Sequence, residues 1–300
     1  MEKGWYILNY HDISWEENLF MRGIGGHFPP DIFRSHLEQL SLYGKLISVA
    51  DGLKQYSSGV INETLISFWF DDGFAGVRKY AFPLLADYNV KGSVSINSKF
   101  LLRKEMFWRL KLSYLSQTDG LRLIRSKLRK YGYKTNSSVK LFVLDHFSEG
   151  IIDAIESVYR SFTKEYFRED AFRIFDDVEG IKVLLKNNWE ICNHSASHYP
   201  VGEDTYIHRF KEEFEECEKA LNEYFGIKTK YWVLPFDRYR SKRLFEVFNN
   251  SDDENRYLVL VGNKVNINPR CTNNVLFRII PPKDDGKGLV KYLRKIPIRD

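Results

Sequence analysis

The residues best suited to chemistry lie in two short motifs, Asp71-Asp72-Gly73 and His194-Ser195-Ala196-Ser197-His198. Each motif directly follows an apolar segment that is typical of a buried strand, residues 64–70 for the first and residues 189–193 for the second. By itself the first motif is most often only a turn, because Asp and Gly are common turn residues. Histidines four residues apart can share a metal ion where the backbone curls, and the nearby Pro200 favours a loop there instead of a helix.

Taken together, the two motifs predict a catalytic metal site. Parallel strands of one sheet deliver the residues that follow them to the same carboxyl-terminal face. Two imidazoles and one carboxylate leave an open position on a tetrahedral zinc ion, which is the arrangement of catalytic zinc sites. The neighbouring carboxylate, not bound to the metal, would then serve as the general base for the metal-bound water.

A third segment, residues 231–236, is also expected to be a strand that ends in a polar loop. Pro235 fixes the backbone there, and the backbone N–H of Phe236 is free to donate a hydrogen bond. A backbone N–H beside a metal ion is well placed to stabilise a tetrahedral oxyanion. Phe236 is therefore a candidate catalytic residue through its main chain.

The elements that would position these motifs alternate between strands and helices. The expected strands are residues 5–10, 46–49, 64–70, 92–97, 189–193, 231–236 and 257–261, and the expected helices are one capped by Asp31 and those at 77–88, 181–187 and 207–225. Helix-length connections between strands indicate parallel pairing. The sequence therefore predicts an α/β fold, a single barrel-like domain over residues 1–300.

A helical insertion interrupts this alternation at about residues 100–175. One of its helices places apolar residues on a single face and basic residues on the rest. The apolar residues are Leu121, Ile124, Leu128 and Tyr131. We interpret the basic face as solvent-exposed, and Arg125 and Arg129 are the residues that would test for an anionic substrate. We expect the insertion to cover one side of the active-site mouth and to select the substrate.

Composition and charge set the expectations for location and partners. The 300 residues include 45 Lys and Arg against 40 Asp and Glu, a net charge of +5 that does not indicate nucleic acid as a partner. No apolar run approaches the roughly 18 residues that span a bilayer, and the amino terminus does not resemble a signal peptide. The three cysteines show no paired spacing, and Cys192 is expected to face the core. These features favour a reduced, cytoplasmic location.

The carboxyl-terminal tail, residues 287–299, is basic and carries an apolar stripe. The stripe consists of Leu289, Val290, Leu293 and Ile296. An amphipathic tail of this kind can bind an anionic membrane or dock on its own domain. Docking on the barrel is the favoured interpretation, and membrane contact stays open as the alternative.

The motifs and their order resemble those of the polysaccharide deacetylases, also called the NodB-homology domain or carbohydrate esterase family four. Phe70-Asp71-Asp72-Gly73 resembles the first family motif, and His194–His198 resembles the second, with 188–193 as the typical approach to it. Leu234-Pro235-Phe236 resembles the third. The resemblance covers roughly residues 5–100 and 176–282 and implies a distorted (β/α) barrel of the deacetylase type. It does not explain the insertion.

The resemblance also implies roles for individual residues. Asp71 corresponds to the general base, and the metal ligands would be Asp72, His194 and His198. Ser195 corresponds to the hydroxyl that steadies the ligand loop, and Phe236 to the oxyanion donor. The family removes N- or O-acetyl groups from sugars, usually with a divalent metal, so the expected cofactor is Zn²⁺.

Three departures from the family pattern affect these expectations. The third motif lacks the arginine that orients the base, with Arg238 the nearest candidate, and Asp237 replaces the usual glycine. The carboxyl-terminal Leu-x-His motif, which supplies the general acid, is missing. His11 is the best replacement, with His27 behind it, and the alternative is that His11 is a structural histidine at the barrel rim.

The sequence therefore predicts a metal-dependent hydrolase that removes an N-acyl group, acetyl or else formyl, from a sugar or glycoconjugate. A glycolipid precursor, a nucleotide-sugar or a glycosylated small molecule is the expected substrate, because no signal peptide is recognised. The alternative is a catalytically impaired carbohydrate-binding module that retains the deacetylase fold. The missing arginine and acid favour the module, and the intact set of Asp71, Asp72, His194 and His198 opposes it.

Overall fold

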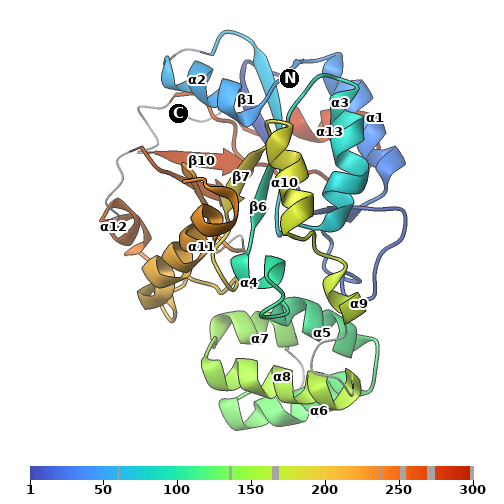
Figure 1. Ribbon diagram of the computed structural model, residues 1–300, viewed down its shortest axis with the longest axis vertical. Helices are drawn as coiled ribbons and strands as arrows, with labels where there is room; N and C mark the ends of the chain where they lie inside the picture. Colours follow the sequence, from blue (N-terminus) through green and yellow to red (C-terminus); the bar gives the residue numbers. More distant parts are fainter. Residues whose placement is uncertain are drawn as a thin grey trace.

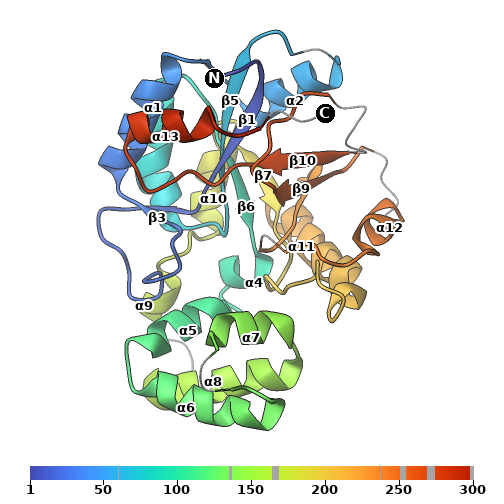
Figure 2. The same cartoon turned by 180° about the vertical axis from the view of Figure 1, so that it is seen from behind.

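Parallel strands form a closed sheet at the centre of the computed structural model, which describes residues 1–59, 61–134, 137–163, 169–236, 238–250, 255–268 and 274–297 (Figures 1 and 2). Within these residues the larger sheet has eight strands in the order β1-β5-β6-β7-β8-β9-β10, with β4 also paired to β5. Its strands are β1 (Gly4–Tyr10), β4 (Lys45–Leu46), β5 (Thr64–Phe70), β6 (Ser93–Ile96), β7 (Glu190–Asn193), β8 (Tyr231–Val233), β9 (Tyr257–Val261) and β10 (Val275–Arg278). A second, two-stranded sheet pairs β2 (Asp12–Ile13) with β3 (His27–Phe28).

The large sheet closes because the segment after β10 bonds to β1. The N–H of Ile279 donates to the carbonyl of Ile7, and the N–H of Asn9 donates to the carbonyl of Ile279, both at 2.8 Å. All seven residues of β1 are buried, as expected for a parallel strand that is covered on both faces. The predicted α/β fold, a distorted (β/α) barrel with a helical insertion, is confirmed.

The interior of the barrel is apolar for most of its length and polar at the carboxyl ends of the strands. Trp5 and Ile7 of β1 belong to a buried cluster with residues of β5, β7, β8, β9 and β10. Side chains alternate between the two faces of a strand, so Asn9 continues the face of Trp5 and Ile7. Asn9, Asp71 and Arg278 meet there with exposed fractions of 2%, 3% and 0%. A buried polar layer therefore lies above the apolar core.

Helices cover the outside of the barrel (Figures 1 and 2). They are α1 (Pro30–Ser41), α2 (Val49–Ser57), the π-helical turn η1 (Val77–Ala81), α3 (Phe82–Ala86), α4 (Ser98–Leu101), α10 (Val178–Lys186), the 3-10 turn η3 (Ile207–Arg209), α11 (Phe210–Phe225), α12 (Leu244–Asn249) and α13 (Gly286–Leu293). No helix in the described ranges is both long enough and apolar enough to cross a membrane.

Two local expectations are wrong. Asp31 does not cap α1: the helix begins at Pro30 after Pro29, because proline suits the first helical turn, and Asp31 lies within that turn. The strand expected over 46–49 is only β4, because Ser48 caps α2 and accepts a hydrogen bond from the N–H of Asp51 at 3.1 Å. Helix α2 therefore begins within the apolar run that suggested a longer strand.

The carboxyl-terminal tail docks on the barrel, as favoured from the sequence. Figure 2 shows α13 beside α1, and Leu289 and Leu293 have exposed fractions of 0% and 1%. His36 of α1 reinforces this contact, since its Nε2 lies 2.7 Å from the carbonyl oxygen of Asp284. The apolar stripe is therefore already buried within the protein. The last residues of the tail, 298–300, and Cys271 lie outside the described part.

The insertion forms a group of helices at the carboxyl ends of the strands, at the bottom of Figures 1 and 2. It contains α5 (Trp108–Ser116), α6 (Gly120–Leu128), the 3-10 turn η2 (Arg129–Tyr131), α7 (Val139–Asp145), α8 (Glu149–Thr163) and α9 (Glu169–Phe172). Ile124 and Leu128 of α6 are fully buried, whereas Arg125 and Arg129 are exposed. The interpretation of the basic face as solvent-exposed is confirmed. The assignment of residues 1–300 to one domain stays a prediction.

Candidate metal and catalytic site

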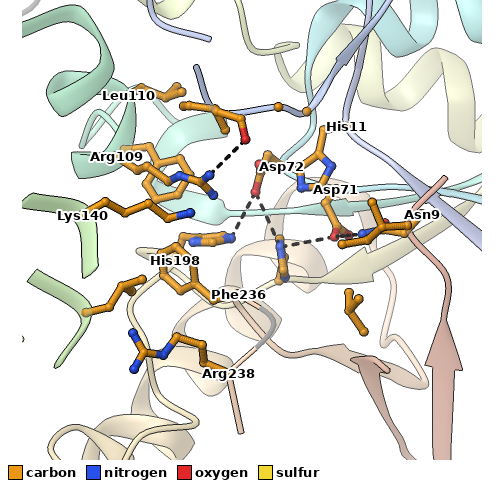
Figure 3. A pocket seen from close by; sticks show the side chains of 18 of the residues that line it. Asn9, His11, Asp71, Asp72, Arg109, Leu110, Lys140, His198, Phe236 and Arg238 are labelled. Carbon is orange, nitrogen blue, oxygen red and sulfur yellow. Dashed lines mark hydrogen bonds and ion pairs between the residues drawn. The ribbon is translucent and has the colours of Figure 1, made fainter. Parts of the chain in front are cut away.

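Asp72, His194 and His198 come together where β5 and β7 end. Their potential ligand atoms all lie within 4.8 Å of one another, and all three residues are buried. Oδ1 of Asp72 is 3.5 Å from Nε2 of His194 and 3.3 Å from Nε2 of His198 (Figure 3). Ligands on a tetrahedral ion with bonds of about 2.1 Å are spaced about 3.4 Å apart. We call these three residues the triad; its spacing fits a divalent metal ion.

The surroundings of Asp72 also fit a cation. Its Oδ1 is buried and accepts no hydrogen bond in the described part of the chain. Burial, and next the charge of Asp71, raise the pKa of Asp72 well above its ordinary value. A buried carboxylate without a donor is costly unless a positive charge compensates it. A metal ion that accepts nitrogen and oxygen ligands, such as Zn²⁺, would supply that charge.

Both histidines are oriented by the loop that carries them. Nδ1 of His194 lies 2.8 Å from the carbonyl oxygen of Val233, so the proton sits on Nδ1 and Nε2 keeps its lone pair for a metal. Oγ of Ser195 accepts a hydrogen bond from the N–H of His198 at 3.0 Å, in keeping with the steadying role that the resemblance implies. Glu213 of α11 accepts another from the N–H of Ser197 at 2.8 Å. The ligand loop is therefore fixed before any metal binds.

Left-handed backbone conformations gather at this site. Asp72, Ser195, His198 and Phe236 have φ values of +68°, +68°, +53° and +62°. Such conformations cost a non-glycine residue on the order of 1 kcal/mol or more and tend to persist where function requires them. At the end of β5 the turn to positive φ directs Asp72 toward the histidines, whereas Asp71 still points into the barrel.

Asp71 has a different environment from its neighbour. Its Oδ2 accepts a hydrogen bond from Nδ2 of Asn9 at 3.0 Å, and its Oδ1 accepts one from Nη1 of Arg278 at 2.6 Å and another from Oγ of Ser95. Burial alone would raise the pKa of Asp71, but the charge and the hydrogen bond of Arg278 outweigh it and hold the pKa below its ordinary value. Asp71 is therefore ionised without needing a metal ion.

Arg278, and not Arg238, takes the place of the arginine missing from the third motif. Nε of Arg238 donates to Glu203 at 2.8 Å, and its Nη2 donates to Asp145, so it is not engaged with Asp71. Arg278 is the last residue of β10, with an exposed fraction of 0%. The sequence motifs did not indicate Arg278. An arginine within an apolar strand was a usable signal, because arginine is almost never fully buried unless paired.

His11 and Phe236 line the same pocket as the triad, and His27 does not. Burial is the main cause that lowers the pKa of His11 to about 4, so its imidazole is neutral at neutral pH. Nε2 of His27 lies 2.7 Å from the carbonyl oxygen of Ser14. The ring of Phe236 packs against His198 with centroids 4.5 Å apart. The roles of His11 and of the Phe236 N–H stay predictions, and Asp237 lies outside the described residues. Cys192 faces the core, as expected.

The pocket has a volume of about 520 Å³ and lies between the strand ends and the insertion. The insertion contributes seven lining residues, namely Phe107, Arg109, Leu110, Lys140, Leu141, Leu144 and Asp145. The insertion therefore covers one side of the mouth of the site, as expected from the sequence. Arg125 and Arg129 are not among the lining residues, so the basic residues singled out in the sequence do not face the site.

Comparisons with known proteins point to one family. The sequence profile of the polysaccharide deacetylase family matches residues 142–249. IcaB from Ammonifex degensii is similar in structure at a TM-score of 0.61, with 14% sequence identity over 98% of each chain. The Streptococcus pyogenes deacetylase PplD, solved in complex with acetate, has a TM-score of 0.60 and 12% identity, covering 97% of this chain and 98% of its own. A de-N-acetylase from Aggregatibacter actinomycetemcomitans has a TM-score of 0.60 and 15% identity, covering 96% and 99%.

The profile match over residues 142–249 and the shared fold make this chain similar to the polysaccharide deacetylases of the NodB type. The resemblance inferred from the sequence motifs is thereby confirmed. The search of curated proteins found no relative.

The first prediction is that the triad binds one Zn²⁺ ion per chain. Asp72→Asn or His198→Ala removes a ligand, and we expect zinc affinity to fall on the order of 100-fold, measured by isothermal titration calorimetry. His208→Ala is the control, because His208 is an exposed histidine that does not line the pocket. Wild-type protein that takes up no zinc, or ligand variants that bind it as wild type does, would disprove the assignment.

The second prediction concerns the buried pair of Arg278 and Asp71. Arg278→Gln leaves the Asp71 carboxylate buried without its cation, so we expect the free energy of unfolding to fall by about 3–5 kcal/mol. The double variant with Asp71→Asn removes both charges and should recover part of that loss. Urea unfolding measures both values. Arg243→Gln, at an exposed position, is the control, and equal losses for Arg278→Gln and the control would contradict the pairing.

Proposed function

We propose that this protein is a metal-dependent hydrolase that removes an N-acyl group, acetyl or formyl, from a sugar or glycoconjugate. The observation that carries the proposal is the pair of adjacent carboxylates with opposite surroundings. Asp72 faces two imidazoles, whereas Asp71 is held ionised by Arg278 and Asn9. Two of the similar structures support the acyl-transfer chemistry, since one is a de-N-acetylase and the other a deacetylase that contains acetate.

Asp72, His194 and His198 would hold the metal ion, and Zn²⁺ suits their nitrogen and oxygen atoms. When bound, such an ion polarises the acyl oxygen and acidifies the attacking water. The chain's own contribution at this point is the pre-formed, buried triad. Electrostatic effects on a developing negative charge are larger in such a site than in bulk water.

Asp71 would act as the general base. Its Oδ2 is 3.9 Å from Nε2 of His194, so it lies beside the triad without belonging to it. The carboxylate takes a proton from the water as the water oxygen attacks the acyl carbon. The backbone N–H of Phe236 would stabilise the oxyanion. The carbon–nitrogen bond then breaks, and the products are the free acid and an amine that has gained one proton.

His11 is the proposed donor of the proton to the departing amine. Because its imidazole is neutral in the resting protein, it must first gain a proton during the reaction. The proton that Asp71 has accepted is the available source, and Asp71 and His11 line the same pocket. His11 would therefore pass on a proton received during the reaction, because it is not protonated in the resting protein.

The proposal also includes the acceptor sugar and the location of the protein. A nucleotide-sugar, a glycolipid precursor or a glycosylated small molecule fits a pocket that the insertion closes on one side. A cytoplasmic location follows only from the sequence expectation, and cell fractionation would test it.

The third prediction is that Asp71→Asn abolishes turnover while zinc stays bound. The amide keeps the size of the carboxylate but loses its proton affinity, so we expect kcat to fall by at least roughly 100-fold. Release of acetate or formate from N-acylated amino sugars measures activity, and metal analysis measures zinc. Asp72→Asn is the matched control, because it should lose zinc first and recover part of its activity when zinc is added.

Full activity of Asp71→Asn would contradict the proposed base. A wild-type protein that binds zinc and sugar but releases neither acetate nor formate would instead support the alternative of a binding module that retains the fold.

The fourth prediction is that His11→Gln lowers kcat by roughly 100-fold without changing zinc affinity or the KM for the sugar. The reason is that glutamine keeps a polar group at this position but cannot pass on a proton. His36→Gln is the control, since His36 is a buried histidine that bonds Tyr10 and Asp284 and does not line the pocket. Unchanged kcat in His11→Gln would return His11 to its structural interpretation at the barrel rim.

A further inference from the structure

The insertion brings two cations into the pocket that form no ion pair with a carboxylate of the described chain. Arg109 of α5 and Lys140 of α7 both line the pocket, and Figure 3 shows their side chains extending toward Asp72 and His198. Nη2 of Arg109 donates to the carbonyl of Ile24 at 3.1 Å, which leaves its charge unpaired. Among the described residues Lys140 has neither an ion pair nor a hydrogen bond.

Each carboxylate that lines the pocket in the described chain has another partner or belongs to the triad. Asp71 is paired with Arg278, and Asp72 belongs to the triad. Asp145 is paired with Arg238, and Nη1 of Arg240 lies 3.6 Å from it. Since these three are the carboxylates among the described lining residues, Arg109 and Lys140 are a surplus of positive charge.

This surplus is costly to the protein without a ligand. Lys140 is half-buried, and burial, followed by the like charges of Arg109 and Arg238, lowers its pKa to about 8. Like charges brought together in a partly desolvated pocket repel each other more strongly than they would in water. An anion between them would relieve this repulsion and gain charge-assisted hydrogen bonds.

The two cations lie near the triad, so an anion bound by them would lie near the reacting acyl group. The charge of Arg109 acts on both Asp72 and His198, so Arg109 lies beside the triad. A sugar whose acyl group reaches the triad would place its other substituents against the insertion. An arginine fork with a lysine point charge suits phosphate, which presents several oxygens and more than one negative charge.

We propose that the substrate is an acylated sugar that carries a phosphate group, and that Arg109 and Lys140 bind this phosphate. The inference rests on the proposed function, because it takes the acyl group to lie at the triad. Arg109 and Lys140 are specificity-determining residues in this assignment, and the chemistry remains with Asp71 and the triad.

The test measures binding without turnover. In the zinc-loaded Asp71→Asn protein, calorimetry compares N-acetylglucosamine with N-acetylglucosamine 1-phosphate. We expect the phosphorylated sugar to bind at least about tenfold more tightly, with the advantage shrinking as salt is added. Lys140→Met should remove most of this advantage and leave the binding of the neutral sugar unchanged. Arg125→Gln is the matched control, because it removes one positive charge from the exposed face of the same insertion.

The proposal is overturned if both sugars bind equally, or if Lys140→Met weakens both to the same extent. It is also overturned if an N-acetylated sugar carrying a carboxylate in place of the phosphate binds as tightly. Uridine diphosphate N-acetylglucosamine and a short-chain lipid phosphate of the same sugar form two further arms. Whichever of these two ligands binds more tightly than the simple sugar phosphate identifies the compound that carries the phosphate. If neither does, the simple sugar phosphate is the assigned substrate. A wild-type protein that deacylates no acylated sugar would refute the proposed function separately, because the binding measurements do not depend on turnover.

Discussion

The buried contact of Arg278 with Asp71 is the interaction on which the site depends. It joins β10, the last strand of the barrel, to the end of β5, and Nη1 of Arg278 also donates to Oδ1 of Asn9 on β1 at 3.0 Å. Three strands therefore meet through one charged network. A buried carboxylate without this network would take up a proton, and it would then be unable to act as a base.

The same network separates the two neighbouring aspartates. Asp71 follows β5 in the direction of the barrel interior, where donors from three strands hold its charge. Asp72 adopts a left-handed backbone conformation and turns toward two imidazoles that cannot satisfy it alone. Two chemically identical side chains thus acquire different protonation preferences, because Asp71 is paired with the guanidinium of Arg278 and Asp72 has no such partner in the described chain.

The barrel and the insertion contribute different parts of the pocket. The strand ends supply the triad, Asp71 and His11, and His194 is oriented by a hydrogen bond to the backbone of β8. The insertion supplies apolar side chains together with Arg109 and Lys140. Within the insertion, α5 and α6 both pack against α8. The triad and the cations of the pocket are therefore supplied by separate parts of the fold.

The sequence alone determined the barrel class, and it singled out the triad and the candidate base. Strands such as 64–70 are continuous apolar runs, and residues that directly follow parallel strands must meet at one end of the sheet, so local patterns were sufficient. The exposed basic face of α6 also followed from helical periodicity.

Only the tertiary structure decided which arginine serves Asp71 and which cations face the pocket. Arg238 is closer in sequence to the third motif, but Arg278 reaches Asp71 because the barrel closes β10 against β1. Arg125 and Arg129 dominate the charge pattern of the insertion, whereas Arg109 and Lys140, less conspicuous in the sequence, line the pocket. Contacts between residues far apart along the chain depend on closure and helix packing. Periodicity along the sequence reports which face of an element is apolar, and it does not report which distant element lies opposite that face.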